Sequence, residues 1–121
     1  MRSRLAALIV TVAIAAPAAA SRFHFEVVRS TPADGATLEA APKRLQVWFS
    51  QLPARGVSRL ALKRGDADVP LTETTIDAES KSMYADPKTA LAPGAYALMW
   101  RGAGDDGHVQ TGTIAFTIAA D

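Results

Sequence analysis

Apolar and polar residues alternate along this 121-residue chain in short segments, and turn-forming residues interrupt the alternation about every ten residues. From residue 21 onward, no apolar stripe with the period of an amphipathic helix is sustained. Strict alternation indicates half-buried strands, and many short strands at this spacing are typical of a β-sandwich or a β-barrel. The sequence therefore predicts an all-β fold, and about a hundred residues suffice for one domain with one core.

The expected strands are spread over the whole region that follows residue 22. They cover residues 23–29, 45–49, 60–64, 95–101 and 112–118, with weaker strands near residues 69–76 and 82–85. Pro32 and Gly35 mark the first turn, because proline presets φ and glycine tolerates positive φ. Five aromatic side chains are expected to fill the core between the sheets. These are Trp48, Phe49, Tyr96, Trp100 and Phe116.

The first twenty residues have the pattern of a secretory signal peptide. Arg2 and Arg4 precede an uncharged run over residues 5–20 that ends in small residues. A membrane anchor is the weaker interpretation, because the run has only about the minimum length for a span and ends in Ala-Ala-Ala-Ser instead of a basic stop-transfer flank. We therefore expect a cleaved signal peptide at residues 1–20 and a soluble exported domain at residues 21–121.

Charge and composition exclude several function classes for the exported domain. Removing residues 1–20 takes away two of the 13 basic residues, Arg2 and Arg4, and none of the 12 acidic ones, so 11 basic residues remain and the formal net charge is −1. No basic stripe is available for phosphate contacts, so nucleic acid is not an expected partner. The chain has no cysteine. An exported fold of this kind is stabilised by packing alone, and any metal site uses nitrogen, oxygen or thioether ligands.

A glycine-rich run over residues 102–108 separates the last two strong strands and contains Asp106 and His108. Copper(II) prefers a tetragonal set of nitrogen and oxygen donors and outcompetes other first-row divalent ions for such a set. If the loop is extended, residues two apart point to the same side, so Asp106 and His108 offer one oxygen and one nitrogen to the same ion. The alternative is a turn in which Asp106 caps backbone amides and His108 is a solvent-exposed bystander.

The order and spacing of several motifs resemble the CopC family of periplasmic copper-binding proteins. The family pattern Tyr-x-x-x-Trp-Arg, Asp-Gly-His and Gly-x-x-x-Phe is matched by Tyr96, Trp100-Arg101, Asp106-Gly107-His108, Gly112 and Phe116. His24 with Ser30-Thr31-Pro32 resembles the family's opening. Ala41-Pro42 resembles its Ala-Pro motif, and Trp48-Phe49-Ser50 resembles its Phe-Ser-Glu motif. The resemblance extends from His24 to Ile118 and implies a Greek-key β-sandwich of the immunoglobulin or cupredoxin kind.

The resemblance also implies a copper(II) site and a role for it. In the family, the N-terminal histidine binds copper through its amino group and its imidazole, and the matching residue is His24, with Asp106 and His108 as further ligands. The implied protein is a periplasmic carrier or buffer of copper(II) that protects the cell or delivers the metal to a CopD-like importer in the inner membrane. We expect no enzyme, because no Ser–His–acid set, cysteine nucleophile or phosphate-cradling loop is present. We also expect the protein to be a monomer. The alternative is an immunoglobulin-like interaction module with weak or lost metal binding.

The identity of the mature N-terminal residue decides what His24 can offer. Signal peptidase favours small residues at −1 and −3, so cleavage after Ala20 or Ser21 fits better than cleavage after Phe23. If trimming exposes His24, the site has an amine, two imidazoles and a carboxylate. If Arg22 is first, the amine, two deprotonated amides and the His24 imidazole can wrap copper without the loop. If Ser21 is first, His24 offers an imidazole to a weaker and more hydrated site. A half-buried strand position without a metal role is the remaining alternative for His24.

One departure from the family pattern and the small number of methionines bear on the site. Phe-Ser-Glu appears here as Phe49-Ser50-Gln51, so a neutral amide replaces a carboxylate whose charge can bind the metal or hold a ligand imidazole. Some family members carry a methionine-rich loop for copper(I), but residues 21–121 contain only Met83 and Met99, and core packing explains Met99. We expect no dedicated copper(I) site.

Overall fold

The computed structural model describes residues 24–120, which form nine β-strands. None of these residues is helical, so this part of the chain has no helix that is long and apolar enough to cross a membrane. The expected signal peptide at residues 1–20 and the beginning of the first expected strand at Phe23 lie outside the described residues.

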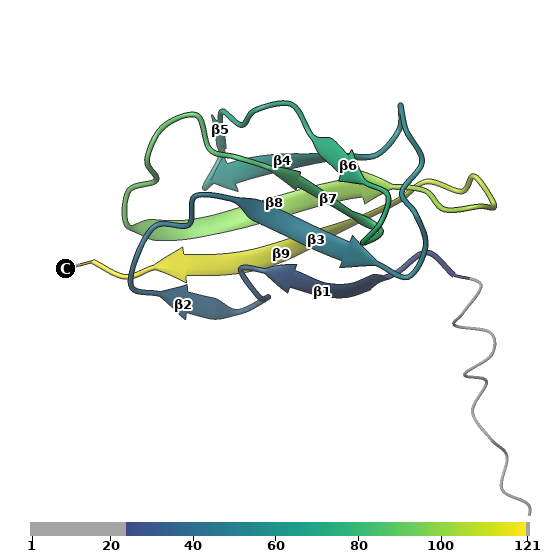
Figure 1. Cartoon of the computed structure of the whole chain (residues 1–121). Helices are drawn as coiled ribbons and strands as arrows, with labels where there is room; N and C mark the ends of the chain where they lie inside the picture. Colours follow the sequence, from purple (N-terminus) through teal and green to yellow (C-terminus); the bar gives the residue numbers. More distant parts are fainter. Residues whose placement is uncertain (1–23, 121) are drawn as a thin grey trace, which may run out of the picture.

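The strands form two sheets that lie face to face (Figure 1). The first sheet has the order β1 (Val27–Thr31), β3 (Leu45–Phe49), β7 (Ser82–Ala85) and β6 (Thr75–Asp77). The second has the order β2 (Ala36–Leu38), β9 (Gln110–Ile118), β8 (Gly94–Gly102), β4 (Arg59–Arg64) and β5 (Ala67–Val69). All neighbouring strands are antiparallel except β2 and β9, which are parallel. The chain crosses repeatedly between the sheets, as in Greek-key sandwiches, and the all-β sandwich that the sequence predicts is confirmed.

The core lies between the two sheets and follows from the alternation of the sequence. Every second residue of β3 is buried, and β8 and β9 follow the same rule along most of their length. Of the expected core aromatics, Phe49, Tyr96, Trp100 and Phe116 are buried. The Tyr96 ring stacks on Phe116 at 5.3 Å between centroids, and its hydroxyl donates to the Ala92 carbonyl, so the polar end of this buried side chain is satisfied.

Trp48 and Met99 do not lie in the core, contrary to the prediction from the sequence. Trp48 lies between two buried residues of β3 and therefore faces outward, where the Arg29 guanidinium stacks 3.6 Å from the centroid of its ring. Met99 lies between two buried residues of β8 and is 40% exposed. Successive side chains of a strand point to opposite faces, so the position within the strand decides burial even for large apolar residues.

Two elements differ from the expected strands. The weak strand expected near residues 69–76 is divided, because the chain leaves the second sheet after Val69 and passes to the first. Pro70 follows at the break and has no N–H to donate to a ladder. The short strand β2 was not expected. It pairs with β9 beyond Gly35, whose N–H donates to the Ala115 carbonyl at 2.6 Å.

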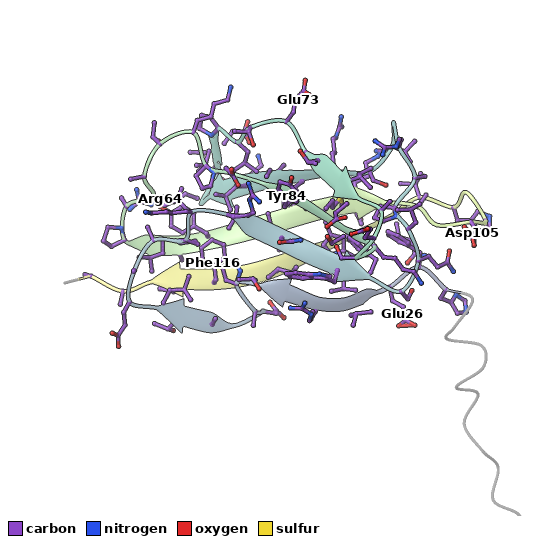
Figure 2. All side chains as sticks on the ribbon, in the orientation of Figure 1. Glu26, Arg64, Glu73, Tyr84, Asp105 and Phe116 are labelled. Carbon is purple, nitrogen blue, oxygen red and sulfur yellow. The ribbon has the colours of Figure 1, made fainter. Side chains whose placement is uncertain are left out.

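One end of the sandwich gathers the residues that the sequence singles out for metal binding. Figure 1 shows the loop between β8 and β9 projecting from the end at which β1 begins, whereas the C-terminus lies at the opposite end. Figure 2 places Asp105 in this loop and Glu26 at the same end, with Arg64 toward the other end. Glu26, at the start of the first sheet, and the loop with Asp105 therefore lie at the same end of the sandwich although they are far apart in the sequence.

Candidate metal centre

Residues 103–109 form a short loop that is closed by the pairing of β8 with β9. The ladder between the two strands continues to the pair of Gly102 and Gln110, so the loop begins and ends at fixed points. Within the loop, the Gly107 N–H donates to the Gly104 carbonyl at 3.1 Å, and the φ of Gly107 is 76°. Glycine adopts this left-handed backbone without a steric penalty, so the turn depends on Gly107. The loop is a turn and not an extended segment.

Asp106 and His108 lie next to each other in this turn. The backbone N–H of His108 donates to Oδ1 of Asp106 at 2.9 Å, and Nδ1 of His108 lies 3.3 Å from Oδ2 of Asp106. Both side chains reach solvent, with 84% of the His108 and 48% of the Asp106 side chain exposed. The turn alternative is correct for the backbone, since Asp106 does cap an amide. The same turn brings an oxygen donor and a nitrogen donor together.

The pKa of the Asp106 carboxyl is lowered from its ordinary value. The main cause is the hydrogen bond from the His108 N–H, which partial desolvation opposes, and the electrostatic influence of the His108 and His24 imidazoles lowers it further. The carboxyl is therefore ionised at neutral pH, which is the form that binds a metal ion.

His24 is exposed just before β1, and its neighbour in the sequence anchors it. Phe25 is buried, with its ring stacked on Phe49 at 4.4 Å between centroids and edge-on to Trp100 at 6.1 Å. His24 is thus not a half-buried strand residue. Its imidazole is open to solvent, while the buried ring beside it limits how far its backbone can move.

Ser50 ties the His24 segment to the end of β3. Its hydroxyl donates to the His24 carbonyl at 2.6 Å and accepts the Glu26 N–H at 3.0 Å, and its backbone N–H donates to the Glu26 carbonyl at 2.8 Å. Neither Ser50 nor Phe25 was expected to support the site. The signal for Phe25 is its place between two polar residues at the start of an alternating segment, which marks it as inward-facing.

The donors at this end of the molecule fit copper(II). Asp106 and His108 supply an oxygen and a nitrogen, and the exposed His24 before β1 carries a second imidazole. Imidazole nitrogen and carboxylate oxygen are the atoms that a tetragonal copper(II) site uses. Within residues 24–120, no three His, Cys, Asp or Glu side chains lie close enough together to hold a metal ion. A complete site therefore requires the exposed His24 side chain to approach the loop, or an amine or water to fill the remaining positions.

A β-sandwich that presents nitrogen and oxygen donors at one end has the architecture of a small metal-binding domain. The family model described as the CopC domain matches residues 27–119, so the chain belongs to the CopC family. The resemblance found in the sequence motifs is confirmed. The matched region contains Asp106 and His108 and begins after His24.

Known proteins agree with this family assignment. Copper resistance protein C of Xanthomonas campestris pv. juglandis is 29% identical over 121 residues, which cover 94% of this chain and 94% of the relative. The crystal structure of PcoC, a methionine-rich copper resistance protein from Escherichia coli, has a TM-score of 0.70 and 29% identity and covers 78% of this chain and 98% of PcoC. CopC from Methylosinus trichosporium OB3b shares the fold, with a TM-score of 0.72, 22% identity and coverage of 79% and 94% of the two chains.

Proposed function

We propose that this protein binds copper(II) in the periplasm and acts as a carrier or buffer, in copper resistance and homeostasis or in delivery to a membrane importer. The observation that carries the proposal is the contact of Asp106 with His108, which presents an ionised carboxylate and an imidazole on an exposed loop. Membership of the CopC family and similarity to two copper resistance proteins support copper as the ion.

The proposed ligands are His24, Asp106 and His108. Two donors that lie about 2.0 Å from one ion and at right angles to each other are about 2.8 Å apart. Oδ2 of Asp106 and Nδ1 of His108 are 3.3 Å apart, so a small shift lets both bind the same copper ion. His24 completes the set with its imidazole, and also with its amine if trimming makes it the N-terminal residue.

The cellular part of the proposal rests on the expected signal peptide at residues 1–20. Its cleavage delivers residues 21–121 as a monomer outside the cytoplasm and sets how many residues precede His24. The accepting partner is a CopD-like importer in the inner membrane, and the protein itself catalyses no reaction.

Competition titration with copper(II) and a chelator of modest affinity tests the proposal. Proteins that begin at Ser21 and at His24 are compared, and paramagnetic resonance reports the donor atoms. We expect one copper(II) ion per protein with tetragonal nitrogen and oxygen ligation, and tighter binding when His24 is the N-terminal residue. If neither protein retains stoichiometric copper, the carrier function is wrong and the interaction-module alternative stands.

A further inference from the structure

We propose that Ser50 and Gln51 are positioning residues that fix the two halves of the proposed copper site relative to each other. One half is the His24 segment, and the other is the loop that carries Asp106 and His108. The proposal rests on the proposed function. Ser50 binds the backbone of the His24 segment, and Gln51 binds the backbone of the loop that carries Asp106 and His108. The two residues are consecutive, so both halves of the site are attached to one point at the end of β3.

The first attachment is made by three hydrogen bonds of Ser50. Two of them pair Ser50 with Glu26 and the third is the bond from its hydroxyl to the His24 carbonyl. A carbonyl held in this way fixes the backbone of His24, while its side chain stays exposed. The imidazole can rotate toward a metal ion, but the segment cannot drift away from the loop.

The second attachment is made by the side chain of Gln51. Its Oε1 accepts the backbone N–H of Asp105 at 2.8 Å, which bridges 54 positions of the sequence. The amide of Gln51 also occupies the space beside Gly104, where an added Cβ would collide with Oε1 and would lie 2.9 Å from the side-chain carbonyl carbon. The loop backbone therefore packs directly on this side chain, and a side chain at position 104 would displace the Gln51 amide.

The point to which both halves are attached is rigid. Phe49 ends β3, is buried, and packs against Phe25 and edge-on to Trp100 at 5.2 Å between centroids. Its backbone N–H donates to the Lys81 carbonyl at 2.8 Å. Ser50 and Gln51 follow this anchored residue directly, so their positions are set by the core.

The role inferred for Gln51 differs from that of a carboxylate near the metal. The contact with Asp105 needs only an acceptor oxygen at the end of the side chain, and it needs no charge. Partners that orient metal ligands without binding the metal change affinity by about 10- to 100-fold when they are removed. Gln51 acts through the loop and contributes no atom to the metal.

The experiment compares Gln51→Ala, Gln51→Glu and the matched control Gln46→Ala. Gln46 lies in the same strand region and donates a side-chain hydrogen bond to Ser82, but it takes no part in either attachment. Copper(II) affinity, paramagnetic resonance parameters and hydrogen exchange of the Asp105 amide in the metal-free protein are measured for each.

We expect Gln51→Ala to weaken copper(II) binding by about 10- to 100-fold, to alter the paramagnetic resonance parameters and to speed exchange of the Asp105 amide. Gln51→Glu should restore slow exchange of the Asp105 amide in the metal-free protein, because its side chain keeps the acceptor oxygen, and Gln46→Ala should leave all three measurements unchanged. Wild-type affinity and spectrum in Gln51→Ala, or fast exchange of the Asp105 amide that Gln51→Glu does not slow, would overturn the proposal.

Metal-free exchange separates this proposal from the proposed function. If the wild-type protein binds no copper, the carrier function fails. Hydrogen exchange of the Asp105 amide then tests by itself whether Gln51 holds the loop. Faster exchange in Gln51→Ala than in Gln46→Ala supports the attachment, and equal exchange rejects it.

Discussion

His108 exposes 84% of its side chain and contacts Asp106 through its backbone N–H and its Nδ1. We therefore predict that His108→Ala abolishes tight copper binding and changes the stability of the metal-free protein by no more than about 0.5 kcal/mol. Thermal melts with and without copper(II) measure both effects. The wild-type midpoint should rise with copper because the ion binds only the folded state, and the midpoint of His108→Ala should not.

A copper-dependent rise that persists in His108→Ala would place the ion elsewhere. The chain offers one clear alternative, a chelate formed by Arg22, Phe23 and His24 at an exposed N-terminus. Its formation would contradict the assignment of the loop without affecting the family assignment.

The two tryptophans differ in burial and give a matched pair of variants. Trp100 is 9% exposed and meets Phe25 and Phe49 edge-on, whereas Trp48 faces outward under Arg29. We predict that Trp100→Ala destabilises the domain by about 3–5 kcal/mol, a large share of the stability of a small domain. Trp48→Ala should cost less than half as much. Urea unfolding measures both, and equal losses would contradict the assignment of Trp100 to the core.

The loop between β8 and β9 sets the pH dependence of copper binding. The folded pKa of Asp106 is lowered, so its carboxylate persists as the pH falls from 7 to 5, and any stabilisation that it provides is lost only at lower pH. Free imidazole has a pKa of about 6.5, and protons compete with copper for it. We predict that copper retention fails as the pH drops below about 6. Competition titrations from pH 7.5 to about 4.5 measure it, and a flat affinity over that range would argue against histidine ligands.

A second prediction for the same loop concerns its backbone in the metal-free state. The hydrogen bond from the His108 N–H to Asp106 should keep its full strength until the pH falls through the lowered pKa of that carboxyl, because the ionised carboxylate accepts the bond more strongly than the neutral acid does. The chemical shift of the His108 amide should therefore titrate below the ordinary aspartate value of about 3.9. Titration at or above that value would show that the turn does not form in solution.

The elements that could be predicted from the sequence are those in which alternation is long and turn chemistry is explicit. β3, β8 and β9 satisfy both conditions, and the motif containing Asp106 and His108 was found because it interrupts two such strands. β2 was missed because its three residues show no period, and it pairs with residues 116–118 of β9, which are far away in the sequence. The break after Val69 was missed because a change of sheet depends on tertiary packing, which local patterns do not encode.

The supporting contacts of the candidate site were predictable only in part. Asp106 and His108 could be predicted as candidate ligands from their residue types and their spacing. Ser50 and Gln51 make their contacts with residues that are distant in the sequence, and their side chains are common in loops. From the sequence, Gln51 indicates only the loss of a carboxylate relative to the family pattern. In the folded chain, its side chain accepts a hydrogen bond from the backbone of Asp105.

At the scale of the whole molecule, the residues that stabilise the sandwich and the candidate metal ligands lie in different places. The core fills the space between the sheets, and the candidate ligands lie on exposed segments at one end. The formal charge of residues 21–121 is close to zero, so no strong field draws the protein to a polyanion, and local ligation decides what it binds. Under the proposed function, metal exchange at the loop and the N-terminal segment is expected to leave the fold intact.

Mass action gives a prediction for the whole domain. Copper(II) at about 100 times its dissociation constant should add about 2.7 kcal/mol to the free energy of unfolding, and removal of the metal by a chelator should reverse the gain. Calorimetry with copper, without copper and after chelation measures the effect. An unchanged midpoint under saturating copper would show that the ion does not bind the folded state in preference to the unfolded chain.

The central claim is that copper(II) is bound by the loop imidazole together with the imidazole near the N-terminus. Pulsed paramagnetic resonance of the untagged, copper-loaded protein counts bound imidazoles directly, and the chain contains only two histidines, His24 and His108. We predict two bound imidazoles in the wild-type protein that begins at His24 and no more than one in His108→Ala. The same number of imidazoles in both proteins would contradict the assignment of His108 as a ligand.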